Sequence, residues 1–68
     1  MSYILVENYL KVVDSVKNLQ TMAFVPFDPA NTDYQQFKTD VAAGVPLEDA
    51  EGVLMTQEQV DEFLRTIP

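Results

Sequence analysis

The segment of residues 24–37, FVPFDPANTDYQQF, most limits the folds that are open to this chain. Pro26 has no backbone N–H to donate, so a strand that contains it is expected at the edge of a sheet. The Asp-Pro pair that begins at Asp28 favours a turn, and Asn31 or Thr32 is a favourable helix N-cap. The segment therefore predicts an edge strand that turns directly into a helix.

The helix is expected at about residues 32–43. Thr32 and Gln35 have the spacing of a capping box, and Gly44 followed by a proline is typical of a helix end. Four apolar side chains at helical spacing share one face: Tyr34, Phe37, Val41 and Ala42.

The residues before this segment indicate strands. Residues 2–18 are rich in β-branched and aromatic side chains but keep no single period, so one or two irregularly joined strands, or a short amphipathic helix, fit the pattern. Next come a strand, a polar turn near residues 18–21 and a returning strand at residues 22–27. We expect a β-hairpin layer over about residues 3–27, with an open edge beside Pro26.

A second helix is expected at about residues 57–66, after a loop at residues 45–53. Thr56 and Gln59 form another capping box, and Met55 can pack against Val60 as a hydrophobic staple. Its apolar stripe consists of Val60, Phe63, Leu64 and Ile67. Together the elements predict a single small α+β domain, residues 1–68, in which two short helices pack on the hairpin layer.

A domain this small has a marginal core. The chain has 68 residues and contains neither cysteine nor histidine, so a disulfide and the common zinc sites are not expected. The loop at residues 47–58 overlaps a calcium-loop pattern, but Leu47 stands where the first carboxylate ligand is needed. We expect no metal or other cofactor, and we expect burial against other proteins or copies of the chain itself.

The charge is strongly acidic and unevenly distributed. The net charge is −7, and residues 1–20 contribute two acids and two bases, so all of the excess lies in residues 21–68. This balance argues against direct binding of nucleic acid. A solvated acidic face is one interpretation; a DNA-mimicking inhibitor, or a surface for a basic partner, is the other.

Membrane insertion and catalysis are not expected. No apolar run reaches the length that spans a bilayer, and residues 3–6 are too short for a signal peptide, so synthesis in the cytoplasm is expected. Ser2 and Ser15 have no histidine to activate them, and two glycines cannot form a phosphate-binding loop. The sequence favours a protein without enzymatic activity or a small-molecule substrate.

The aromatic side chains of the chain are expected in the core, with partner contact as a second possible role: Phe24, Phe27, Tyr34, Phe37 and Phe63.

Residues 15–44 combine a hairpin, an Ala-Phe-x-Pro-Phe strand, an Asp-Pro-x-Asn-x-Asp-Tyr-x-x-Phe segment and a helix that ends at glycine. In this they resemble a short module of bacteriophage tail-associated proteins, including those of marine and cyanobacterial phages. The chain departs from that module at Asp40, where tryptophan is common in the helix, and at Val45, where Asn-Thr-Pro often follows the glycine. The matching residues are Ala23, Phe24, Pro26, Phe27, Asp28, Pro29, Asn31, Asp33, Tyr34, Phe37 and Gly44.

The resemblance implies a structural protein of the virion in the tail, baseplate or fibre-attachment region. An acidic DNA-mimicking inhibitor of a host nuclease or polymerase, or a head decoration protein, is the alternative. Such a protein would be made in the host cytoplasm and would contact other virion proteins or its own copies. We expect the intersubunit surface on the hairpin edge and the apolar N-terminal segment, at Tyr3, Ile4, Val6, Tyr9, Val25 and Phe27.

Overall fold

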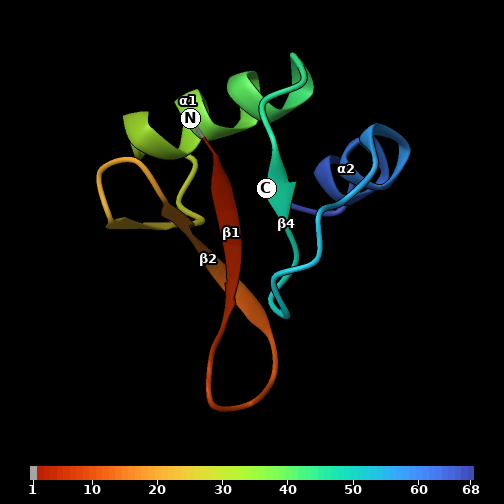
Figure 1. The fold of residues 1–68 in the computed structure, drawn as a ribbon. Coiled ribbons are helices and arrows are strands. Elements are labelled where there is room, and N and C mark those ends of the chain that lie inside the picture. Colours follow the sequence, from red (N-terminus) through yellow and green to blue (C-terminus); the bar gives the residue numbers. More distant parts are fainter. Residues whose placement is uncertain (1) are drawn as a thin grey trace.

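A computed structural model describes residues 2–68 as a four-stranded sheet with two helices (Figure 1). The strands lie in the order β3-β2-β1-β4. The fold is the small α+β arrangement expected from the sequence. Its elements are β1 (Tyr3–Glu7), β2 (Val13–Asn18), β3 (Ala23–Pro26), α1 (Thr32–Ala42), β4 (Leu47–Glu48) and α2 (Gln57–Leu64).

The N-terminal segment is an inner strand of the sheet. β1 pairs antiparallel with β2 and parallel with β4, so the strand interpretation of this segment is correct and the helix interpretation is wrong. Tyr3 and Leu5 are buried, whereas Ile4 and Val6 are half-buried on the opposite face, which is the alternation of a strand. An irregularity between Val6 and Glu7 breaks this period, which explains why the sequence pattern looked mixed.

The β2–β3 hairpin confirms the predicted turn. Oδ1 of Asn18 accepts hydrogen bonds from the backbone N–H groups of Gln20 and Thr21, at 2.9 and 3.3 Å. β3 is an edge strand, as Pro26 predicted, because within residues 2–68 it pairs with β2 on one side and with no strand on the other.

The other edge was not predicted. Residues 45–53 were expected to form a loop, but Leu47 and Glu48 form β4 beside β1. The chain then returns antiparallel to β4 through a bridge between Glu48 and Leu54. A two-residue strand is too short to leave a periodic pattern, and its parallel pairing depends on residues more than 40 positions away.

Helix α1 begins at the N-cap Asn31, whose Oδ1 accepts from the backbone N–H groups of Asp33 and Tyr34. The capping box predicted at Thr32 and Gln35 is wrong, because Thr32 is already the first helical residue and the Gln35 side chain donates to the Pro29 carbonyl. The helix ends one residue earlier than expected. Gly44 follows at φ +106°, a conformation that other residues rarely adopt.

Helix α2 has the predicted capping box. Thr56 Oγ1 accepts from the Gln59 backbone N–H at 3.1 Å, and Gln59 Oε1 accepts from the Thr56 backbone N–H at 2.9 Å. Val60 is buried, whereas Phe63 and Leu64 are half-buried against the core. The predicted stripe therefore faces inward, as expected. Within residues 2–68, neither helix has the length and apolar character needed to cross a membrane.

One cluster of buried side chains joins the sheet to both helices. The Phe27 ring packs against the rings of both Tyr34 and Phe37, at centroid distances of 5.2 and 6.1 Å. Tyr34 also donates from its hydroxyl to the Pro68 oxygen at 2.6 Å, which attaches the last residue to α1. The buried residues are Tyr3, Leu5, Val16, Val25, Tyr34, Phe37, Val41, Leu47 and Val60.

The expectation that Phe24 belongs to the core is wrong. Its side chain is 64% exposed, because Val25 turns inward and alternation along β3 places Phe24 on the opposite face. Lys17 on the neighbouring strand places its Nζ 5.4 Å from the centre of the Phe24 ring, which gives the ring a cation partner.

Candidate functional site

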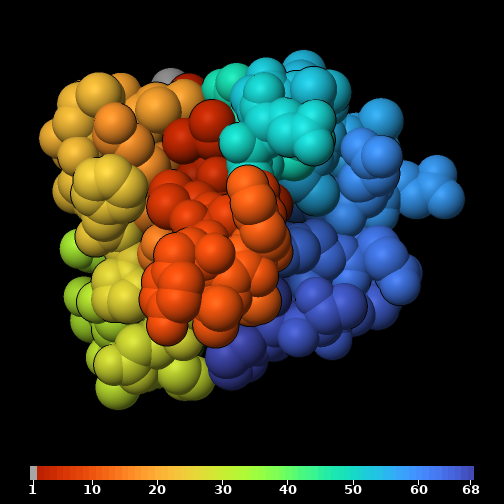
Figure 2. Space-filling view, turned by 90° about the horizontal axis from the view of Figure 1, so that it is seen from below, coloured from red at the N-terminus to blue at the C-terminus, as the bar shows by residue number. Residues whose placement is uncertain are grey.

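The sheet has one face that the helices do not cover. The buried residues of the strands and of both helices belong to one cluster, so the alternate residues of the strands point the other way. Figure 2 looks along the strands, with the red-orange β1–β2 loop at the centre, the amber β2–β3 turn and the cyan segment after β4 above it, and green α1 and blue α2 along the lower border, so the helices lie on one side of the sheet and leave the other at the surface. We call this surface the outer face: Ile4, Val6, Ser15, Lys17, Phe24, Pro26, Glu48 and Leu54.

Strand register aligns five of these residues in one row across the sheet. Ile4 lies at the centre, opposite Lys17 on β2 and opposite Glu48 on β4. The row continues from Lys17 to Phe24 and from Glu48 to Leu54. At the ordinary spacing of strands the row is roughly 19 Å long.

The row combines large apolar side chains with one charge of each sign. Phe24 and Leu54, at its two ends, are 64% and 63% exposed, and Ile4 at the centre is half-buried. Lys17 and Glu48 separate the three apolar residues. Apolar side chains in an uncovered patch with a few placed charges are typical of a surface that contacts another protein.

A second exposed apolar feature is the loop between β1 and β2, which projects from the end of the sheet away from α1 (Figure 1). Asn8 organises it: its Oδ1 accepts from the backbone N–H groups of Leu10 and Val12, and its backbone N–H donates to the Val12 carbonyl at 2.9 Å. Tyr9 and Leu10 are nevertheless 91% and 65% exposed. The loop thus presents two apolar side chains on an ordered backbone.

The structure separates the residues that were predicted to form an interface. Ile4 and Val6 lie together on the outer face, and Tyr9 lies on the adjacent loop. Tyr3 and Val25 are core residues, with 3% and 5% of their surface exposed, so they are removed from the candidate surface. Phe27 is half-buried in the aromatic cluster and supports the fold.

Four of the five residues of the row, all but Ile4, were missed from the predicted interface. Strict alternation of side chains in the segment of residues 22–27 could have placed Phe24 on the outer face, since its neighbour Val25 points inward. The register of the same hairpin pairs Lys17 with Phe24 and so places Lys17 on the same face. Glu48 and Leu54 could not have been found, because their place in the row depends on the pairing of β4 with β1.

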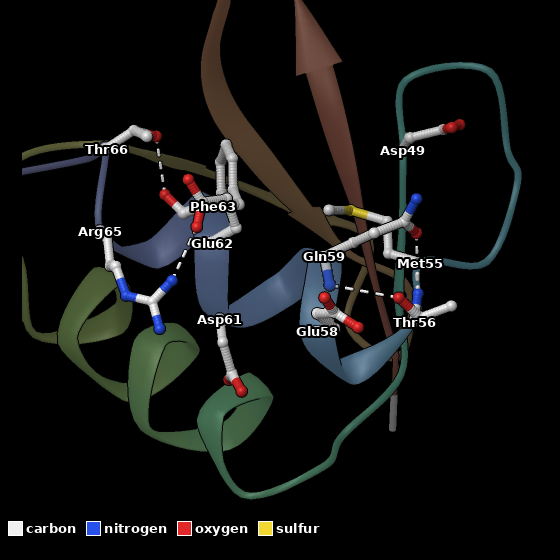
Figure 3. A pocket seen from close by; sticks show the side chains of 10 residues that line it. All are labelled: Asp49, Met55, Thr56, Glu58, Gln59, Asp61, Glu62, Phe63, Arg65 and Thr66. Carbon is white, nitrogen blue, oxygen red and sulfur yellow. Dashed lines mark hydrogen bonds and ion pairs between the residues drawn. The ribbon is translucent and has the colours of Figure 1, made fainter.

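A hollow beside α2 is a weaker candidate (Figure 3). Several of its polar groups are occupied locally: Arg65 donates to Glu62 at 2.7 Å, and Thr66 donates to the Phe63 carbonyl at 2.7 Å. Asp49, across the hollow, accepts from the backbone N–H groups of its own loop. Residues 2–68 contain no group of three acidic, histidine or cysteine side chains placed to hold a metal ion.

Tyr3 is a core residue whose hydroxyl has a strongly raised pKa. Burial, followed by the hydrogen bond to the Asp40 carboxylate, raises the pKa of Tyr3 from its ordinary 10.0 to about 12. Asp40 Oδ2 accepts from the Tyr3 hydroxyl at 2.7 Å, and Oδ1 accepts from Gln36 Nε2 at 2.8 Å. The Oδ2 bond therefore holds α1 to β1, and the Oδ1 bond, within α1, orients the carboxylate.

Comparison with known proteins gives no match to a family model, to a curated protein or to a solved structure. Function is therefore inferred from the residues of the chain itself.

Proposed function

We propose that this chain is a non-catalytic structural protein of a bacteriophage virion, in the tail, baseplate or fibre-attachment region, and that it works through protein–protein contacts. The observation that carries the proposal is the uncovered outer face, where Phe24 and Leu54 expose large apolar side chains on a domain of only 68 residues. A chain that keeps such side chains in water gains most by burying them against another protein.

The phage context is supported by the resemblance of residues 15–44. Several matching residues form the joint between β3 and α1: Pro26 ends the edge strand, Asn31 caps the helix, and Phe27 packs against Tyr34 and Phe37. At the departure Asp40, the carboxylate binds Tyr3 of β1, so this position serves the fold of this chain. In this chain the matching residues thus serve the fold, and the outer face supplies the surface for contacts.

The proposal is tested by quantitative mass spectrometry of purified particles of the phage that encodes the chain. We expect the chain in a fixed ratio to the other virion proteins, after gradient purification and after removal of loosely bound protein by salt. Presence only in the soluble fraction of infected cells would contradict the proposal and would favour an acidic inhibitor. Imaging of particles that carry a tagged chain would then separate a tail location from a head location.

A further inference from the structure

We propose that the outer face binds a second copy of this chain, in a symmetric dimer whose two-fold axis runs parallel to β1 and passes beside Ile4. The inference rests on the proposed use of the outer face as a protein interface, and it names the partner. Two sheets then pack face to face, about 10 Å apart, as in a sandwich.

The order of side chains in the row carries the inference. From β3 to the far edge, the row is apolar, positive, apolar, negative, apolar: Phe24, Lys17, Ile4, Glu48 and Leu54. A two-fold axis parallel to β1 reverses this row in the second copy. Lys17 then faces Glu48 of the other chain, twice per dimer, while Phe24 faces Leu54 and Ile4 faces its own counterpart. The surface is thus complementary to itself, as a symmetric dimer requires.

The same charges select the direction of the axis. An axis perpendicular to the strands would place Lys17 on Lys17 and Glu48 on Glu48 of the second copy, which is repulsive. Within one chain, Lys17 and Glu48 are separated by Ile4, two strand spacings or about 10 Å apart. Neither forms an ion pair with a described residue, so the contact with a second chain breaks none.

The charge of the rest of the molecule also favours this face. The chain has 11 acids and 4 bases, so two copies repel each other over most of their surface. The outer face carries one charge of each sign and is locally neutral. A standard interface takes about 800 Å² from each partner, which is close to a fifth of the 4371 Å² that the chain exposes. Interfaces of this size range from micromolar to picomolar affinity, and the weak, transient ones lie at or below it.

The test is sedimentation equilibrium of the full chain and of four variants, over concentrations from about 1 μM to 1 mM, a range set by the affinity expected for a small interface. Lys17→Glu and Glu48→Lys each replace the two opposite-charge contacts by like-charge contacts. The double variant Lys17→Glu/Glu48→Lys restores them with the signs exchanged. Glu58→Lys, on the exposed face of α2, makes the same change in net charge as Glu48→Lys and serves as its control.

The original chain, of 7.7 kDa, is expected to reach twice its mass as concentration rises. Each single reversal should weaken the dimer by roughly tenfold or more, and the double variant should recover it. Glu58→Lys should dimerise at least as well as the original chain. Circular dichroism and thermal unfolding of every variant show whether it is folded. If a single variant is unfolded, the dimerisation of the double variant decides the test.

A monomer throughout the concentration range would overturn the dimer, as would single reversals that dimerise like the original chain or a folded double variant that stays monomeric. These outcomes are distinct from failure of the proposed function. A monomeric chain that is nevertheless present in purified particles overturns only the dimer, and the outer face then meets another virion protein. A dimer that is absent from particles overturns only the virion assignment.

Discussion

The hydroxyl of Tyr3 in β1 donates a 2.7 Å hydrogen bond to Oδ2 of Asp40 in α1. The bond joins the inner strand of the sheet to a helix 37 positions later in the chain. The Tyr3 ring also meets the Phe37 ring edge to face, with centroids 5.1 Å apart. One side chain therefore links strand and helix through a charged hydrogen bond and through aromatic packing.

Tyr3→Phe should lower the free energy of unfolding by about 1.5 to 3 kcal/mol, because it removes a hydrogen bond to a charged group and keeps the ring. Urea denaturation at pH 7 measures the change. Tyr9→Phe is the matched control, since the Tyr9 side chain is 91% exposed and its loss of a hydroxyl should change stability very little. Equal effects of the two substitutions would contradict the role assigned to the Tyr3–Asp40 bond.

The stabilisation by Tyr3 should depend on pH in the alkaline range. The pKa of Tyr3 is raised from 10.0 to about 12 in the folded chain, so its contribution is complete below pH 10 and is lost as the pH rises toward 12. A shift of this size corresponds to roughly 3 kcal/mol. The difference in unfolding free energy between the original chain and Tyr3→Phe should shrink over this interval. A difference that stays constant from pH 9 to pH 12 would show that the tyrosine pKa is not raised.

Replacement of phenylalanine by alanine should have different effects at a buried and at an exposed position. Phe37→Ala removes a fully buried ring and should destabilise the fold by about 3 to 5 kcal/mol. Phe24→Ala removes a 64% exposed ring and should cost at most about 1 kcal/mol, the value of its contact with Lys17, while weakening the dimer. Thermal unfolding and sedimentation of both variants check the pair. A large loss of stability in Phe24→Ala would place that ring in the core after all.

The start of α1 can be tested at two adjacent positions. Asn31→Ala removes the acceptor for two backbone N–H groups and should cost about 1 kcal/mol. Thr32→Ala should be close to neutral, because Thr32 is exposed and already helical. Chemical denaturation distinguishes them; a larger loss in Thr32→Ala would favour the capping position that the structure does not support.

Elements with local signals were predictable from the sequence. The capping box at Thr56 and the glycine at Gly44 located helix ends, because helix termini are set by residues close in the chain. Pro26 located the edge strand for the same reason, since a missing N–H has a local consequence.

The parts of the fold that depend on distant pairing were not predictable. β4 exists because β1 lies beside it, and its two residues leave no pattern of their own. The inner position of β1 follows from the same pairing, which is why Tyr3 was assigned to an interface although it is buried. The candidate interface depends on the pairing of β4 with β1, because Glu48 and Leu54 join Ile4 in one row only when β4 is in place.

The dimer through the outer face is tested most directly by mixing two variants that should each be monomeric. Lys17→Glu carries two acids in the row, and Glu48→Lys carries two bases, so they should pair with each other and not with themselves. Native mass spectrometry of an equimolar mixture, with Glu48→Lys labelled with ¹⁵N, should show dimers that contain one labelled and one unlabelled chain. Absence of mixed dimers, or labelled and unlabelled homodimers formed as readily as mixed ones, would contradict the contact between Lys17 and Glu48 of the second copy.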